Sequence, residues 1–126
     1  MQFRLKTSVK TMNILKDLQS CTNLTPNVLA RLAISLSLGD PDQVDNFPTN
    51  TNGLEFNRHT LTGSHDLIYK SLIAQHCGRH LTDEEYFPYY IKLHLDRGVI
   101  KLFNEYKYAG NFEKLITNLV NLSTEV

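Results

Sequence analysis

The chain has 126 residues, of which 41% are hydrophobic and 21% charged, and its 13 lysines and arginines balance its 13 aspartates and glutamates. This composition is typical of one globular domain and argues against a disordered chain. There is no apolar run of the ~18 residues that a membrane span needs and no apolar stretch of a secretory signal. Two cysteines are too few for a disulfide scaffold. We therefore expect a single cytoplasmic domain with reduced thiols.

Positive charge is concentrated in the first third of the chain. Residues 1–38 contain five cations against one acid, Asp17, which gives +4 there and leaves −4 on the remainder. The five cations are Arg4, Lys6, Lys10, Lys16 and Arg31. A basic segment on a neutral protein favours a local anionic partner, for which nucleic acid is the usual candidate. An ordinary solvated surface is the alternative interpretation.

Residues 3–8, FRLKTS, alternate apolar and polar side chains as a half-buried β-strand does. The alternation puts Phe3 and Leu5 on an inner face. The outer face then carries Gln2, Arg4 and Lys6. No second strand of comparable quality follows in the next seventy residues, and a lone strand leaves its backbone groups unpaired. We therefore expect this strand to pair with the same strand of a second copy.

Two helices are predicted next. The first spans residues 9–21, with Ser8 as its N-cap. Thr25 followed by Pro26 predicts the start of the second, because Thr caps a helix and Pro fits its first position. This second helix, residues 26–38, carries apolar side chains on nearly every face. That pattern predicts burial on several sides, which a subunit interface would supply most easily.

The order strand, helix, turn and helix over residues 2–38 is the layout of the ribbon-helix-helix DNA-binding unit. There, two chains pair their strands into a ribbon that enters the major groove, where Arg pairs with guanine and Gln with adenine. The start of the second helix, at Thr25 and Asn27, offers free N–H groups to a phosphate. Lys10 and Lys16 supply a further basic surface. The alternative is a ribbon that only holds an oligomer together.

The rest of the chain is predicted as a loop at residues 39–53 and a mostly helical part at 54–126. A short strand or ordered turn at 54–61 precedes a helix that begins at 63 or 64 and ends at Gly78. Its apolar stripe consists of Leu67, Ile68, Leu72 and Ile73. The fold class is therefore mainly α, in one domain of residues 1–126.

Further signals divide the C-terminal part. Thr82 and Glu85 form a capping box at a helix start, and Pro88 predicts a kink soon after. The helix that follows is expected to end at Gly98. Two more amphipathic segments flank a turn at residues 109–111.

Histidines provide one candidate metal site. His76 and His80, with Cys77 between them, have the spacing of metal ligands on a continuous helix. Gly78 interrupts that helix, and no second ligand pair accompanies it. Chance placement is the favoured interpretation, so we predict neither a metal nor another cofactor.

A second cluster concerns catalysis. Glu55, Arg58, His59 and Asp66 lie close in sequence and fit either an acid–base or phosphate-binding site or a salt-bridged turn. No glycine-rich phosphate loop and no nucleophile motif accompanies them. We therefore favour the salt-bridged turn and assign no catalytic residue.

Three stretches, LTPNVLARLAISLSL, GLEFNRHTLTGSHD and HLDRGV, resemble the DndE family of DNA sulfur-modification proteins. The Glu-Phe-Asn-Arg stretch is the most distinctive, because neither helix periodicity nor capping requires it. The resemblance extends over nearly the whole chain. Its matching positions are Leu24–Asn27, Glu55–Arg58, Thr60, Leu61, Gly63, Gly98 and Val99.

The resemblance implies a role in the bacterial system that replaces a non-bridging phosphate oxygen of DNA with sulfur. It implies a small DNA-binding accessory subunit without a cofactor, which forms a tetramer and favours nicked duplex. The implied partners are DNA, other copies of the chain, and phosphorothioation proteins that include a DndC-like iron–sulfur protein and a DndD-like ATPase. The family assigns no individual DNA contact here, so those predicted come from the ribbon and from local charge. They are Gln2, Arg4, Lys6, Lys10, Lys16, Thr25, Asn27 and Arg58.

Alternatives stay open at this level. The protein is instead a metal-dependent DNA-nicking enzyme if Glu55, Arg58, His59 and Asp66 converge on one site. It is a scaffold subunit without DNA affinity if the charge asymmetry is incidental. The oligomer is either a dimer of the ribbon-helix-helix type or a tetramer.

Overall fold

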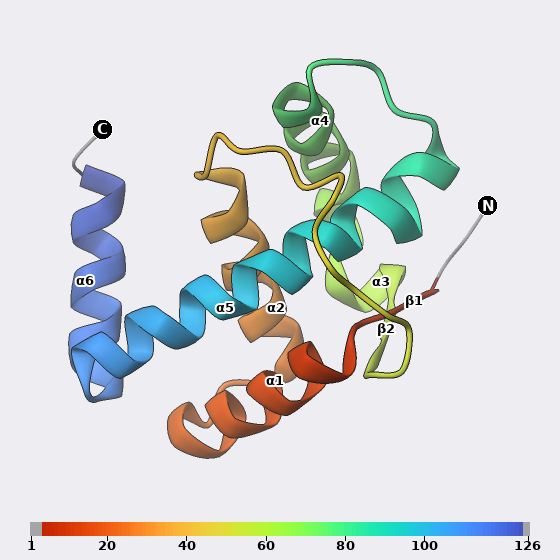
Figure 1. The fold of residues 1–126 in the computed structure, drawn as a ribbon. Helices are drawn as coiled ribbons and strands as arrows, with labels where there is room; N and C mark the ends of the chain where they lie inside the picture. The colour runs from red at the N-terminus through yellow and green to blue at the C-terminus, as the bar shows by residue number, and fades with distance from the viewer. Residues whose placement is uncertain (1–3, 125–126) are drawn as a thin grey trace.

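The computed structural model describes residues 4–124, with side chains described except at 112 and 122–124. Gln2 and Phe3 therefore lie outside the described residues. The elements follow in the order that Figure 1 shows, and the predicted mainly α fold is confirmed. They are β1 (Arg4–Lys6), α1 (Val9–Thr22), α2 (Pro26–Leu38), β2 (Glu55–Asn57), α3 (Arg58–Leu61), α4 (Asp66–Cys77), α5 (Ile91–Ala109) and α6 (Phe112–Thr124), with a 3₁₀ turn at Gly63–His65 and a kinked turn at Glu85–Tyr90.

The first strand pairs within the chain. β1 and β2 are antiparallel, with Leu5 opposite Phe56 and Lys6 opposite Glu55. Leu5 and Phe56 face the core, whereas Arg4 and Lys6 are exposed, as the alternation predicts. The prediction that this strand finds its partner only in a second copy is wrong. β2 lies within residues 54–61, where a short strand or ordered turn was predicted. The ribbon-helix-helix comparison keeps only its element order.

Local capping signals place the first two helices. The Ser8 hydroxyl accepts a hydrogen bond from the Thr11 N–H at 3.1 Å, and Asn23 ends α1 in the left-handed conformation with φ 61°. Thr25 caps α2 with its own hydroxyl. α1 extends one residue beyond the predicted 9–21, to Thr22, and α2 matches the predicted 26–38.

α5 is the central helix of the fold. It crosses the middle of the molecule, packs along α2, and also contacts α1 and α6 (Figure 1). The predicted burial of α2 on several sides is confirmed, but α5, α1 and α3 of the same chain supply it. The apolar faces of α2 therefore give no independent argument for a subunit interface. Its buried apolar residues are Leu29, Ala30, Ala33 and Ile34.

The predicted helix end at Gly98 is wrong, because α5 continues through it to Ala109. A Cβ built on Gly98 would lie 1.8 Å from the carbonyl oxygen of Ala33 on α2. Glycine is needed here because the two backbones nearly touch, and not because the helix stops. The actual end comes at Gly110, with φ 82°, which confirms the predicted turn.

The segment between α4 and α5 follows its sequence signals. Gly78 ends α4 with φ 84°. The capping box forms in both directions, with 3.0 Å from the Thr82 N–H to the Glu85 carboxylate and 3.2 Å from the Glu85 N–H to the Thr82 hydroxyl. The Phe87–Pro88 bond is cis, and Phe87 departs from helical geometry, so the kink predicted at Pro88 is confirmed.

The apolar stripe predicted on α4 is mostly at the surface. Only Ile73 is buried. Leu67, Ile68 and Leu72 are 74%, 57% and 44% exposed. The periodicity identified the helix correctly, but only part of its apolar side chains face the core.

A buried polar network holds the long loop between α2 and β2. The Asp96 carboxylate of α5 accepts hydrogen bonds from the Thr11 hydroxyl at 2.6 Å, from the Lys92 ammonium at 3.1 Å and from the hydroxyl of Thr49. Lys92 also donates to the backbone carbonyl of Asn50 at 2.6 Å. This network holds the loop against α1 and α5. β2 follows the loop directly in the chain and pairs with β1.

The C-terminal helix α6 stands apart from most of the molecule (Figure 1). Leu115 is buried where α6 meets α5, whereas Val120, further along, is 54% exposed. Among residues 4–124, no helix has both the length and the apolar character that crossing a membrane requires.

Candidate nucleic-acid interface

Two predicted DNA contacts lie on the outer face of β1. The Arg4 side chain is 67% exposed, and its guanidinium is 3.7 Å from the carboxylate of Glu55 on β2. Lys6 is exposed as well and stands opposite Glu55 in register. An ion pair at such exposure contributes little to stability. Both cations are therefore accessible to an anionic ligand.

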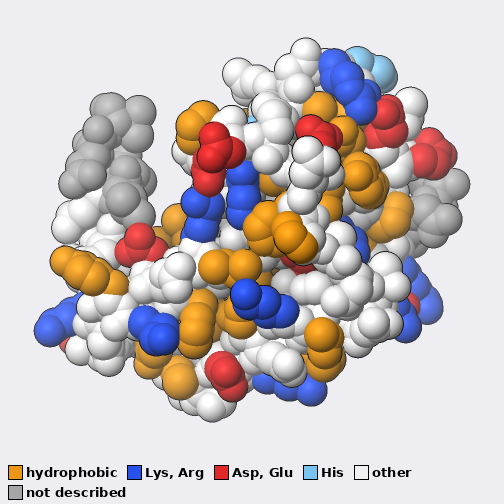
Figure 2. Space-filling view, in the orientation of Figure 1, with side chains coloured by type: hydrophobic (Ala, Val, Ile, Leu, Met, Phe, Trp, Pro, Cys, Tyr) orange, Lys and Arg blue, Asp and Glu red, His pale blue; other side chains and the backbone are white. Residues whose placement is uncertain are grey.

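Two further cations lie on the solvent side of α1. Lys10 and Lys16 are exposed, together with the acid Asp17. The opposite side of the helix is buried through Ile14, Leu15 and Leu18. On the face that Figure 2 shows, positive and negative side chains are interspersed, as the zero net charge leads one to expect.

The start of α2 carries the next two predicted contacts. The Thr25 hydroxyl is used as a helix cap and accepts from the Val28 N–H at 3.4 Å. Asn27 is partly buried, and its Oδ1 is buried with no hydrogen-bond partner among the described residues. Buried side-chain polar atoms usually have a partner, so this one distinguishes Asn27 from Thr25.

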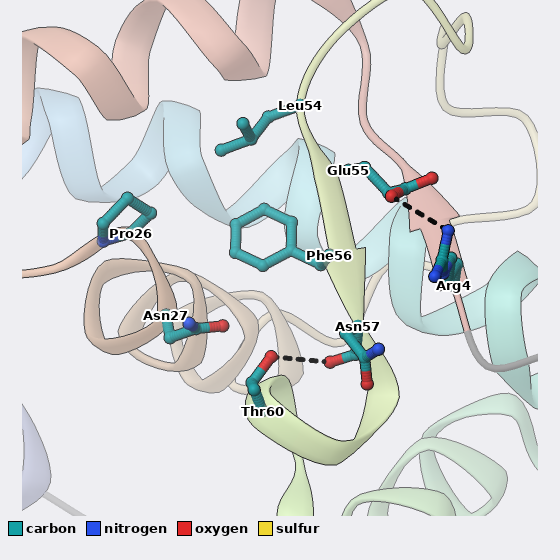
Figure 3. Close-up of a pocket in the computed structure, with 8 residues that line it drawn as sticks. All are labelled: Arg4, Pro26, Asn27, Leu54, Glu55, Phe56, Asn57 and Thr60. Atoms are coloured by element: carbon teal, nitrogen blue, oxygen red, sulfur yellow. Dashed lines mark hydrogen bonds and ion pairs between the residues drawn. The ribbon is translucent and has the colours of Figure 1, made fainter.

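The structure brings Arg4 and Asn27 to one pocket of about 340 Å³ (Figure 3). β1, the start of α2, the segment 54–57 and α3 all contribute to it. A shared pocket for residues 4 and 27 was not predicted, because it also needs residues 54–57 and 60, which lie beyond the long loop between α2 and β2. Its lining consists of Arg4, Pro26, Asn27, Leu54, Glu55, Phe56, Asn57 and Thr60.

Arg58, the last predicted contact, lies elsewhere. Its side chain is 7% exposed, and its guanidinium is 2.7 Å from Asp66 and 3.5 Å from Asp83. Burial works to raise the pKa of Asp66, but hydrogen bonds from Arg58, Thr62 and Tyr86 outweigh it, so this pKa is lowered. Arg58 thus joins α3, α4 and the segment before α5, and its location supports a structural role.

The residues proposed for a nicking enzyme do not converge. Glu55 faces Arg4, whereas Asp66 is bonded to Arg58. His59 is exposed, and its backbone N–H donates a hydrogen bond to the side chain of Asn57, which caps α3. The salt-bridged turn that the sequence analysis favoured is therefore present between Arg58 and Asp66, and Glu55 does not belong to it.

The histidines form a different pair from the predicted one. The ring of His76 packs edge-on against His94, with 4.7 Å between ring centroids. Burial, the nearby His76 and Arg97 lower the pKa of His94 to about 3, so its ring is neutral in the folded protein. His80 is exposed. Within residues 4–124, no group of three or more His, Cys, Asp or Glu residues is placed to hold a metal ion.

Sequence reasoning missed the residues that hold the interface in place. Asp96 and Lys92 are buried in α5 and fix the loop before β2. Arg97 donates to the backbone carbonyls of Ser37 at 2.7 Å and Asp42 at 2.5 Å. The available signal was three charged residues within the first two turns of α5, a spacing that suits a solvent face equally well.

Fold and interface together define a small, mainly helical protein. Its N-terminal strand and first helix expose four cations, and one of them, Arg4, lines a pocket of polar and apolar groups. The family model of the DNA sulphur modification protein DndE matches residues 4–110. The chain belongs to the DndE family.

Comparison with solved structures agrees with this fold. The crystal structure of DndE from Escherichia coli B7A, involved in DNA phosphorothioation modification, has a TM-score of 0.65 and 22% identity, covering 81% of this chain and 98% of that one. A DndE G21/24K mutant involved in DNA phosphorothioation has a TM-score of 0.63 and 23% identity, covering 82% and 99%. No match was found among curated proteins. α6 lies beyond the residues that the family model matches.

Proposed function

We propose that this protein is a DNA-binding accessory subunit of a DNA phosphorothioation system. Membership of the DndE family supports the assignment of this protein to a DNA phosphorothioation system. The observation that carries DNA binding is the exposure of Arg4 and Lys6 on β1 and of Lys10 and Lys16 on α1. Exposed cations on neighbouring elements neutralise successive phosphates, and this electrostatic term dominates duplex affinity.

The proposal includes a preference for nicked over intact duplex and assembly with other copies and with the DndC- and DndD-like proteins. The family resemblance supports these features. Of the predicted contacts, the proposal keeps Arg4, Lys6, Lys10 and Lys16 as phosphate contacts and Asn27 at the adjoining pocket. Gln2, Thr25 and Arg58 stay predictions, and the contacts of the latter two lie within the chain.

Binding to matched intact and nicked duplexes tests the proposal, with fluorescence anisotropy followed from about 50 to 200 mM salt. We expect binding that weakens steeply with salt, because each neutralised phosphate releases counterions, and tighter binding to the nicked duplex. Replacing Lys6, Lys10 and Lys16 together by Ala should lower the affinity and reduce the salt slope by about 3. Lys114→Ala removes an exposed cation from α6 and serves as the matched control.

Two results would contradict the proposal. Undetectable binding to both duplexes at the lowest salt favours a scaffold subunit without DNA affinity. Equal losses in the triple variant and in Lys114→Ala remove α1 and β1 from the interface. Incubation of supercoiled plasmid with Mg²⁺ or Mn²⁺ separately tests the enzyme alternative, because nicking that Glu55→Gln abolishes would establish it.

A further inference from the structure

We propose that Glu55 of β2 competes with DNA phosphates for the cations of β1 and thereby sets how tightly this strand binds a duplex. Its carboxylate pairs with Arg4 and stands opposite Lys6. This inference rests on the proposed function, because it names the residue that limits the affinity of the same basic surface.

The register of the two strands places one acid beside two cations. Lys6 stands directly opposite Glu55, and Arg4 stands opposite Asn57, two residues further along. Directly opposite residues have Cβ atoms about 4.5–5.5 Å apart, and diagonal neighbours are within reach of long side chains. The Arg4 guanidinium uses this diagonal reach and lies 3.7 Å from the Glu55 carboxylate. A single carboxylate is therefore close to both cations of β1.

The charged side chains share the solvent side of the two strands. Leu5 and Phe56 are buried, whereas Lys6 and Glu55 between them and solvent are exposed. The side chains of Arg4 and Glu55 are 67% and 47% exposed. Figure 3 shows Arg4 and Glu55 together on one side of β2, with the Phe56 ring on the other. A duplex that approaches the cations of β1 therefore meets the carboxylate as well.

A phosphate and the Glu55 carboxylate need the same donors. Both are anions that accept hydrogen bonds from a guanidinium or an ammonium group. A phosphate that binds Arg4 must replace the carboxylate, which then stands beside the phosphate and repels it. The exposed ion pair opens at little cost. Glu55 therefore lowers the affinity of β1 for phosphate without preventing the contact.

Competition for phosphates differs from a purely structural role in the direction of its effect. Phosphate contacts carry no sequence information, and every duplex offers them. Removal of the competing charge should therefore raise the affinity for intact and nicked duplex by the same factor. It should also steepen the salt dependence, because more phosphate charge is neutralised by the protein. A cross-strand ion pair that only stabilises the sheet would weaken β1 when it is lost.

The first test uses Glu55→Gln, which removes the charge and keeps the size of the side chain. We expect the full-length variant to bind both duplexes about two- to fivefold more tightly at about 50 mM salt, with a salt slope steeper by up to about 1. Glu55→Asp keeps the charge and should bind as the wild type does. Glu113→Gln removes an exposed carboxylate from α6 and serves as the matched control for net charge.

Three results would overturn the role of Glu55 while leaving the proposed DNA binding intact. The first is equal affinity in Glu55→Gln and Glu113→Gln, which would reduce the effect to net charge. The second is weaker binding in Glu55→Gln, which would identify the residue as a structural link between β1 and β2. The third is a gain confined to one of the two duplexes, since both carry phosphates.

A second measurement does not depend on duplex binding. Titration with inorganic phosphate is followed through the Nε–Hε resonance of Arg4 in a ¹⁵N–¹H spectrum. We expect this resonance to saturate at a lower phosphate concentration in Glu55→Gln than in the wild type or in Glu113→Gln. Identical titration curves contradict the competition. If no duplex binds to any of these proteins, the proposed function fails, and the phosphate titration alone decides whether Glu55 competes for an anion at Arg4.

Discussion

Gly98 of α5 and Ala33 of α2 lie in direct backbone contact, so that a Cβ at residue 98 would be 1.8 Å from the carbonyl oxygen of Ala33. That atom belongs to a helix backbone and cannot turn aside as a flexible side chain would. Gly98→Ala should therefore force the central helix pair apart and destabilise the protein by about 1–3 kcal/mol or more. Urea denaturation measures the change.

The matched control is Gly39→Ala. A Cβ at Gly39 would meet only ordinary contacts, the nearest at 3.5 Å from a carbonyl oxygen of Leu36, and φ there is −74°. We expect its unfolding midpoint to stay close to that of the wild type. Similar losses in the two variants would show that glycine at residue 98 is not required by helix packing.

The effects of substituting Lys92 and Asp96 on the free energy of unfolding should depend strongly on each other, because the two side chains form a buried ion pair. Asp96→Ala leaves the Lys92 ammonium buried beside the loop at Asn50 without its carboxylate, and such a loss costs about 3–5 kcal/mol. Lys92→Met with Asp96→Ala removes both charges, so the double variant should be less destabilised than the sum of the two single variants. The four free energies of unfolding form the cycle that checks this. Additive single losses would mean that the two charges do not stabilise each other.

The sequence predicted the elements whose cause is local. Ser8 and Thr25 cap their helices with groups three residues away, and Thr82 with Glu85 forms its capping box within one turn. The residues that specify these structures are adjacent in sequence, so no tertiary information is needed.

The wrong predictions share a different cause. Leu5 finds its partner Phe56 across a loop of irregular sequence, and Gly98 meets Ala33 only when α5 docks on α2. The pocket at Asn27 depends on the same long-range pairing. Glycine after a helical run signals a helix end and a close helix contact equally well, and only the packed structure distinguishes the two.

Substitutions at two adjacent residues of α4 can test which side of this helix packs against the core. Ile73 is fully buried, so Ile73→Ala should cost about 2–5 kcal/mol. Leu72 is 44% exposed, and Leu72→Ala should change the stability by no more than about 0.5 kcal/mol. Both are measured by urea denaturation at equal protein concentration. A large loss for Leu72→Ala that grows on dilution would indicate that another copy covers this residue.

The pH dependence of stability should reflect His94. Burial lowers its pKa from 6.5 to about 3 in the folded protein, where its Nδ1 lies 2.8 Å from the Ser37 hydroxyl. Between these values the unfolded chain binds a proton that the folded protein does not. This contribution to stability is fully present above pH 6.5 and is lost progressively as the pH falls toward 3.

His94→Asn removes the titrating ring and keeps a polar group that reaches toward Ser37. Its unfolding free energy should fall less steeply on acidification than that of the wild type, by up to about 1.4 kcal/mol per pH unit for the one proton concerned. Urea midpoints measured at intervals from pH 7 to about pH 4 give both slopes. If the His94→Asn and wild-type profiles are parallel, the buried ring is not the group whose protonation opposes folding in acid.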